Sequence, residues 1–262
     1  MPRQTKRVLT DDQWDRIAPL LPEHPHSPKG GRPWADDREC LEGILWLLRT
    51  GSRWRDMPID LPSGSTCWRR LRDWAGEGIL QEIHTLLIEE LDELGEIDFD
   101  ELFADATFIR TKKGGADVGK TKAGKGMKLE IIVDASGLPL GLEVAAADVS
   151  EQKLLIPALE DVPVEIPPGT PIVADKGHDS DALRDEIEEA GCIPVIPHRK
   201  NRVKPSRNDG RRLRRYQHRW LIERTNAWLH CYRGLAVRWA YYTFMYVGMA
   251  YLAFIHMALQ RL

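Results

Sequence analysis

Cysteine is scarce in this chain, and the few cysteines are not arranged for structural chemistry. The 262 residues include four, Cys40, Cys67, Cys192 and Cys231, with no C-x-x-C pair and no Cys/His spacing typical of zinc. This pattern excludes a small disulfide-stapled scaffold and a structural zinc centre, and it predicts reduced thiols in a cytoplasmic protein. A chain of this length is expected to form one large domain or two modest ones.

Apolar segments of the kind that target or span membranes are also few. Residues 1–7 are basic but no apolar core follows them, so we expect no signal peptide. Residues 239–260 contain no Asp, Glu, Lys or Arg, and this length could cross a bilayer. Their many Tyr and Trp residues and low Leu, Ile and Val density favour a buried C-terminal helix instead. We therefore expect no membrane partner.

Charge of one sign is missing from long stretches, although the net charge is only −3. Residues 82–105 hold ten acids and no Lys or Arg, whereas residues 199–238 hold thirteen basic residues against two acids. A second basic stretch over 110–128 includes Lys122, Lys125 and Lys128. Such segregation predicts a positive face that contacts DNA phosphates, with a solvated charged surface as the alternative.

The first 95 residues are expected to be helical. Residues 9–14 (LTDDQW) predict a helix capped by Thr10, and a second helix is expected from Asp36 to Thr50. A third, capped by Ser65, carries Arg69, Arg70 and Arg72. This order is typical of a helix-turn-helix DNA reader, although three arginines are also common on surface helices. An acidic helix over 79–94 follows.

From residue 96 the pattern changes to a mixed α/β order. Strands are expected over 101–110, 127–134, 138–147, 171–174 and 193–196, and helices over 151–159, 181–190 and 211–233. The order β-β-β-α-β-α-β-α indicates a mixed sheet with helices packed on it. Residues 119–126, which contain Lys122 and Lys125, are interpreted as a flexible basic loop rather than a phosphate-binding loop.

Three carboxylates occupy positions where charge is costly. Asp105 interrupts the apolar run 102–109, Asp175 ends the run 172–174, and Glu223 follows 220–222 in a basic stretch. A carboxylate removed from water needs a compensating cation. Either Arg and Lys neighbours supply it, or divalent ions do, which would make the trio a catalytic site.

The residues around these acids resemble a known family. Residues 105–107 (DAT), 174–180 (ADKGHDS) and the spacing Tyr216-x-x-Arg219-x-x-x-Glu223 look like the three catalytic blocks of IS4/IS5-type bacterial insertion-sequence transposases. The phrases at 9–14, 30–33 (GGRP) and 48–58 (LRTGSRWRDMP) also resemble the IS5 family, so the likeness covers nearly the whole chain.

The resemblance implies a fold, a reaction and a cofactor. It implies a ribonuclease-H-like catalytic domain over 96–262, preceded by a helical DNA-binding region over 1–95. Asp105, Asp175 and Glu223 would bind two Mg²⁺ ions about 4 Å apart, with Mn²⁺ as a substitute. The enzyme would bind the terminal inverted repeats of its element as double-stranded DNA, cut the strand, and join the freed 3′ hydroxyl to target DNA. A homodimer on DNA is also expected.

The third block has helical spacing of its own. Tyr216, Arg219, Glu223 and His230 recur at intervals that place them on one face of a helix. Arg219 is expected to hold a phosphate and Tyr216 to contact the DNA backbone, while the alternative is a simple Arg219–Glu223 surface pair. The family pattern has Lys where His230 stands, with Arg233 one turn away as a substitute, and Tyr is common at His178. These departures are the only hints of one alternative, a domesticated, non-catalytic DNA-binding regulator. The other alternative is a ribonuclease-H-like nuclease of the same fold that cuts without strand transfer.

Overall fold

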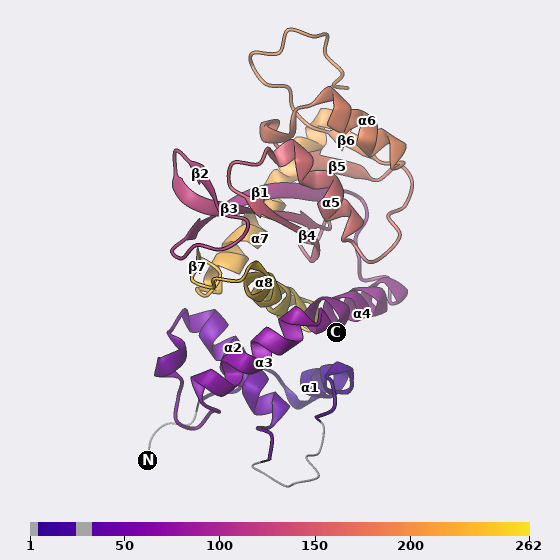
Figure 1. The fold of residues 1–262 in the computed structure, drawn as a ribbon. Coiled ribbons are helices and arrows are strands. Elements are labelled where there is room, and N and C mark those ends of the chain that lie inside the picture. Colours follow the sequence, from indigo (N-terminus) through magenta and orange to yellow (C-terminus); the bar gives the residue numbers. More distant parts are fainter. Residues whose placement is uncertain (1–4, 25–32) are drawn as a thin grey trace.

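The first two helices begin where the sequence predicts. The structure is a computed structural model that describes residues 5–24 and 33–262 (Figure 1). Helix α1 (Asp11–Ile17) opens with a capping box in which Thr10 and Gln13 bond each other's backbone N–H groups. Helix α2 (Asp37–Thr50) is capped by Asp36 and ends at Gly51, whose φ of 68° is a left-handed conformation suited to glycine. Most of the 30–33 phrase that resembles the IS5 family lies outside the described residues.

Helix α3 differs from its prediction at the start. It spans Gly64–Gly76, and the hydroxyl of Ser63, not Ser65, accepts the capping bond from the Thr66 N–H. The connection from α2 runs from Gly51 to Ser63 and includes the short 3-10 helix η2 (Trp54–Asp56). This is longer than the turn of about 3–4 residues in a helix-turn-helix unit, so the likeness is limited to helix order. A further short 3-10 helix, η1 (Ala18–Leu20), extends α1, and the acidic helix α4 (Ile79–Glu93) leads to the sheet.

A seven-stranded mixed sheet forms the centre of the described chain. Its strand order is β2-β3-β1-β5-β6, with β4 paired to β3 and β7 paired to β1. The strands are β1 (Leu102–Thr111), β2 (Gly119–Thr121), β3 (Gly124–Val133), β4 (Pro139–Ala146), β5 (Pro171–Ala174), β6 (Ile193–Val195) and β7 (Val237–Arg238). The five predicted strands are confirmed. The flexible loop expected at 119–126 is wrong, because β2 pairs with the start of β3 as a hairpin.

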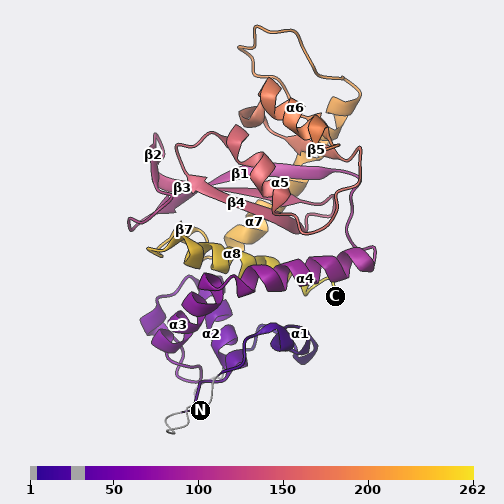
Figure 2. The same cartoon turned by 45° about the vertical axis from the view of Figure 1, so that its right-hand side comes forward.

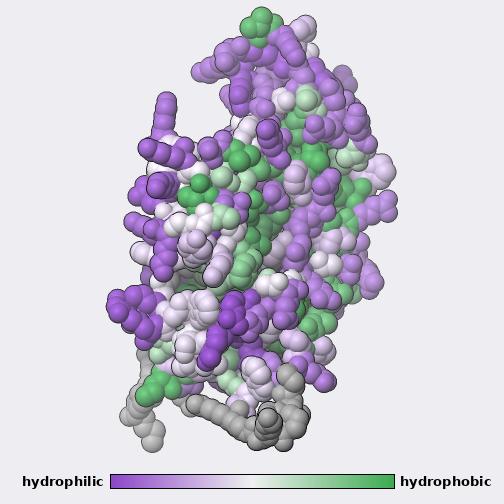
Figure 3. All heavy atoms as spheres, in the orientation of Figure 1, coloured by the Kyte–Doolittle hydropathy of each residue, from purple (hydrophilic) through white to green (hydrophobic). Residues whose placement is uncertain are grey.

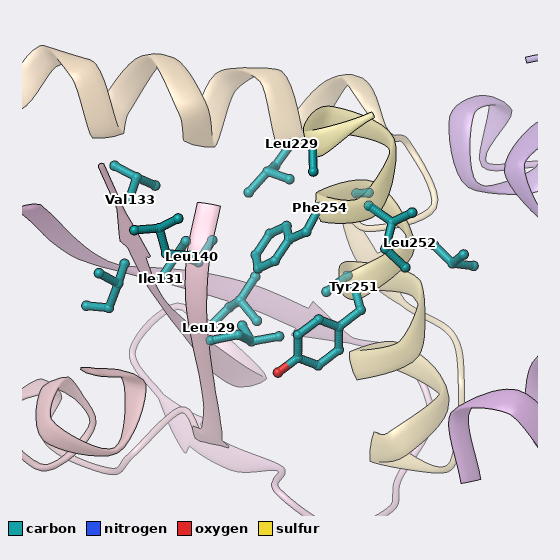
Figure 4. Close-up of a cluster of buried hydrophobic side chains, with 14 of the residues drawn as sticks. Leu129, Ile131, Val133, Leu140, Leu229, Tyr251, Leu252 and Phe254 are labelled. Atoms are coloured by element: carbon teal, nitrogen blue, oxygen red, sulfur yellow. The ribbon is translucent and has the colours of Figure 1, made fainter. Parts of the chain in front are cut away.

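Helices cover both faces of this sheet. On one face, Leu229 of α7 (Trp220–Cys231) and Phe254 of α8 (Thr243–Ala258) pack near Ile131 and Leu140 (Figure 4). Gly141 points to the other face, where an added side chain would meet the Ala158 carbonyl of α5 (Leu155–Glu160). Helix α6 (Asp181–Glu189) packs on β6, and the short helices η3 (Glu151–Lys153) and η4 (Lys176–His178) lie beside each other.

The long helix expected over 211–233 is broken, so that prediction is corrected. Residues Arg212–Arg219 form a 3-10 helix, η5, and only Trp220–Cys231 is α-helical. A 3-10 helix has three residues per turn, which aligns residues three apart on one side. Arg215 and His218 are spaced in this way, and both contact Glu101 at the start of β1. Contact with one buried carboxylate therefore favours the tighter helix here.

Helix α8 joins the two halves of the chain. Figure 2 shows α8 and α4 between the sheet and the helices α1 to α3. Gly248 of α8 faces Ala75 of α3 so closely that an added side chain would clash, and one hydrophobic cluster runs from Leu9 to Leu259. The expected buried C-terminal helix is confirmed, and the described residues include no helix long and apolar enough to span a bilayer. The boundary at residue 95 stays a prediction.

The first testable prediction concerns His84 of α4, which is buried against α8 and donates to the Pro139 carbonyl. Burial lowers the pKa of His84 to about 4, and the bond to Pro139 opposes this only partly. Histidine in the unfolded chain titrates near pH 6.5, so the unfolded state takes up a proton first. The contribution of neutral His84 to the free energy of unfolding is therefore fully present above about pH 6.5, and it is lost as the pH falls toward about 4.

We expect the free energy of unfolding to fall by about 2 kcal/mol between about pH 7 and pH 5 through this group. Urea unfolding of the wild type and His84→Gln at both pH values measures it, because glutamine keeps a donor but does not titrate. An equal pH dependence in the two proteins would remove His84 as the cause.

Candidate active site

Parallel pairing of β1 with β5 places two of the three predicted acids side by side. Ala104 pairs with Ala174 in the register of these strands, and Asp105 and Asp175 are the next residues along each chain. Neighbouring strands lie about 4.8 Å apart, so the two acids leave adjacent strands at the same level. Residues separated by seventy positions in sequence therefore begin from neighbouring backbone sites.

Asp105 is largely buried and is bound from the α7 side. Its two carboxylate oxygens accept hydrogen bonds from Arg219 Nη2 and Asn226 Nδ2, each at 2.9 Å. Burial raises the pKa of Asp105, and the Arg219 charge offsets this only in part. The carboxylate that interrupts the apolar strand is thus held by one cation and one amide.

Arg219 links the first and third acids. While its Nη2 donates to Asp105, its Nη1 lies 3.6 Å from Glu223 Oε1 and 3.5 Å from the Tyr216 hydroxyl. The Glu223 side chain is 60% exposed at the first turn of α7. The structure therefore contains the Arg219–Glu223 pair considered from the sequence, and it extends this pair to Asp105.

Asp175 has a different set of partners. It caps η4, accepting from the Gly177 N–H at 2.6 Å, and lies 3.0 Å from His178 Nδ1. The hydrogen bond from His178 lowers the pKa of Asp175, against the opposing effect of burial. The other nitrogen of His178 lies 3.0 Å from Glu130 Oε1, and both of these side chains are fully buried.

His178 is therefore a buried cation between two acids. Burial alone would lower its pKa, but the bonds to Asp175 and Glu130 outweigh this and raise it to about 10. Glu151 lies close by, paired with Lys128 at 3.1 Å. One oxygen of Glu130 is buried with no hydrogen-bond partner in the described chain, so negative charge behind Asp175 is incompletely compensated.

Three residues at this site escaped the sequence analysis. Glu130 interrupts the apolar run 129–133 just as Asp105 interrupts its own, so the same signal was available. Asn226 lies one helical turn after Glu223, where its amide reaches Asp105. Glu151 carried no sequence signal, because it begins an ordinary short helix.

The donor set suits a hard divalent cation. Ligand atoms of Glu151, Asp175 and His178 lie within 4.8 Å of one another. Both nitrogens of His178 are engaged by carboxylates, which leaves the oxygen donors of Asp175 and Glu151, the type that Mg²⁺ and Mn²⁺ prefer. This cluster includes neither Asp105 nor Glu223. Arg219 currently provides the positive charge next to Asp105 and Glu223.

The predicted DNA contacts fall into two groups. Exposed residues are Lys122 and Lys125 on the β2–β3 hairpin, His230 and Arg233 at the end of α7, and Arg69 and Arg72 on α3. Others are engaged inside the protein, among them Lys128 with Glu151 and half-buried Tyr216 near Arg219.

Arg70 departs from the expected surface position. It is only 6% exposed, pairs with Asp37 at 2.9 Å, and lies over the Trp74 ring. It therefore ties α3 to α2 rather than facing DNA. The lack of metal-ligand spacing around His24 and His198 predicts ordinary surface residues, but they contact Asp37 and Asp179, respectively.

Comparison with known proteins identifies the family of the chain. Residues 9–84 match the family model described as putative transposase of IS4/5 family, and residues 98–257 match the transposase DDE domain. The chain belongs to the DDE transposase family, which confirms the resemblance seen in its sequence. It is a DNA transposase, a metal-dependent enzyme that cuts DNA and transfers the strand.

Relatives and a solved structure support the same family and fold. The insertion element IS402 uncharacterized 16.2 kDa protein of Burkholderia cepacia is 42% identical over 120 residues, covering 44% of this chain and 82% of that protein. A putative transposase for insertion sequence element IS402, also from Burkholderia cepacia, is 34% identical over 124 residues, covering 45% and 55%. The piggyBac transposase in a synaptic complex with hairpin DNA has a TM-score of 0.53 at 11% identity, covering 95% of this chain and 72% of that one. The ribonuclease-H-like mixed α/β fold is confirmed.

The second prediction tests the buried pair behind Asp175. His178→Phe should lower the free energy of unfolding by about 3–5 kcal/mol, because it leaves Glu130 buried without its cation. Adding Glu130→Gln should recover more than half of this loss by removing the charge. Urea unfolding of the wild type, both single variants and the double variant measures the coupling, and additive effects would contradict it.

Proposed function

We propose that Asp105, Asp175 and Glu223 form the catalytic acids of this transposase and hold two Mg²⁺ ions, with Mn²⁺ as a substitute. The β1–β5 register supports this most strongly, because it starts two acids from adjacent positions while Arg219 connects Asp105 to Glu223. Two such ions, when bound, activate the attacking oxygen and stabilise the leaving oxygen of an in-line displacement.

The residues of the chain have separate tasks in this proposal. Asp105 and Asp175 present fixed oxygens, since each is held by two hydrogen bonds. Glu223 is exposed and adjusts its position from the first turn of α7. Arg219 neutralises these acids in the free protein and, with DNA bound, turns to a phosphate oxygen, with Tyr216 contacting the backbone nearby.

The substrate of this site is the terminal inverted repeat of the element as double-stranded DNA. Lys122, Lys125 and Arg233 are exposed, and no ion pair is recorded for them within the described ranges, so they are available to phosphates. His230, Arg69 and Arg72 extend the same contact set. We propose that two copies act as a homodimer on a pair of ends, in the cytoplasm where bacterial DNA lies.

The third prediction concerns the acids. Asp105→Ala, Asp175→Ala and Glu223→Gln should each reduce Mg²⁺-dependent strand cleavage by a factor on the order of 10³ or more, with DNA binding largely retained. Cleavage of a labelled end fragment and gel-shift affinity measure the two properties. Gel-shift selection of bound DNA supplies the fragment, and Glu89→Gln on the acidic helix α4 is the matched control. A variant that still cleaves at the wild-type rate takes its residue out of the site.

The fourth prediction concerns metal binding and strand transfer. Mn²⁺ should bind the full chain, and Asp105→Ala or Asp175→Ala should weaken that binding at least tenfold by calorimetry. A pre-cut end with a free 3′ hydroxyl should be joined to target DNA by the wild type. Metal binding with cleavage but no joining would indicate a nuclease, and absence of acid-dependent Mn²⁺ binding would indicate a regulator.

A further inference from the structure

A cavity of about 470 Å³ lies where the N-terminal helices meet the segment after α7. Its walls include Trp54 of η2, Trp68 of α3, and the segment Trp239, Tyr241 and Tyr242 before α8. This volume falls in the range of ligand pockets, which often form between two parts of a chain. Neither the catalytic acids nor their neighbours line it.

The cavity exposes aromatic rings that a protein core would normally cover. Trp239 is 61% exposed, Tyr241 58% and Tyr242 49%. Figure 3 shows pale side chains of intermediate hydropathy at the height where Figure 1 draws β7, bordered by both hydrophobic and hydrophilic side chains. Exposed aromatic faces are stacking platforms for nucleobases, and each stacked base contributes about 1–3 kcal/mol in such sites.

The positive charge around the cavity also suits a nucleic-acid ligand. Arg53, Lys113 and Arg233 line it, and none of its described lining residues is acidic. Arg53 is paired with Asp56, whereas no ion pair is recorded for Lys113 or Arg233 in the part of the chain that the structure describes. Two free cations beside several aromatic rings favour a strand with phosphates and bases over an apolar protein segment.

Buried Arg238 fixes the aromatic segment in place. Its side chain is fully buried and donates to the carbonyls of Ala116, Ala240 and Tyr241 and to the Thr243 hydroxyl. No carboxylate pairs with it among the described residues, so its role is to hold two loops together. The platform is thereby organised before any ligand binds, which reduces the ordering cost of binding.

Two elements lead from the catalytic acids to this cavity. Helix α7 begins beside Glu223 and ends just before Arg233, and strand β1 runs from Asp105 to Thr111, where β7 pairs with it. At about 1.5 Å per helical residue and 3.3 Å per strand residue, both paths span on the order of 15–20 Å. That is about four to six base steps at 3.4 Å each.

We propose that this cavity binds an unpaired base of the DNA strand that leaves the catalytic site. The inference rests on the proposed function, because cutting a strand frees nearby bases to leave the stack at low cost. Trp239 and the tyrosines stack on the base, while Arg233 and Lys113 bind the flanking phosphates. A second copy of the chain is the competing occupant.

The experiment uses the full chain and a single-stranded oligonucleotide that carries one 2-aminopurine, with a duplex of the same sequence for comparison. The wild type should quench the 2-aminopurine fluorescence by stacking. Trp239→Ala should weaken single-strand binding by roughly five- to hundredfold, whereas Trp239→Phe should retain most of it. Duplex affinity and Mg²⁺-dependent cleavage of a paired end should change less than threefold in Trp239→Ala.

The control is Trp228→Ala, which removes an exposed tryptophan ring of α7 that lines a different cavity. It should leave single-strand affinity unchanged, and circular dichroism should show that each variant is folded. If the wild type cleaves duplex ends normally but does not quench 2-aminopurine, this proposal alone is overturned. An equal loss of duplex and single-strand binding in Trp239→Ala also overturns it. Loss of a DNA-free dimer in Trp239→Ala, seen by light scattering, assigns the cavity to a second copy. No DNA binding at all overturns the proposed function as well.

Discussion

The need to compensate buried carboxylates organises this protein. Parallel pairing of β1 with β5 brings Asp105 and Asp175 to neighbouring positions, where two unscreened negative charges would repel each other. Each acid is paired with a cation: Arg219, just before α7, pairs with Asp105, and His178, after β5, pairs with Asp175. The break between η5 and α7 is also set by a carboxylate, since Glu101 holds the last turns of the 3-10 helix. In the proposed function, the same acids hold the metal ions and Arg219 moves to a DNA phosphate.

Much of this arrangement could be predicted from the sequence, because it depends on local signals. Short apolar runs indicated strands, capping residues such as Thr10 indicated helix starts, and an acid inside an apolar run marked Asp105. Long-range contacts could not be predicted in this way. The 3-10 geometry of η5 depends on Glu101, more than a hundred residues away, and the burial of Arg70 depends on Asp37 in another helix. Asn226 became visible only when α7 was placed against β1.

The comparison between Arg70, Arg219 and Arg238 shows why residue type alone does not assign a role. Arg70 is buried against tryptophan and an acid and ties two helices together. Arg238 is buried among carbonyls and organises loops. Arg219 pairs with Asp105 and Glu223, two of the acids that we propose to hold metal ions. Arginines of the basic stretches therefore serve three purposes: joining helices, organising loops and pairing with acids at the site. Only the groups that each arginine contacts distinguish these roles.

The position of α8 has a consequence for how the chain is made. This helix follows the sheet in translation order, yet it supplies the apolar surface on which the earlier helices α3 and α4 rest. While the ribosome is still adding residues before 243, the emerging helices have no partner for those faces. A shortened product that stops after the sheet would thus leave the apolar faces of α3 and α4 without their partner, and both halves become complete only once α8 has been made.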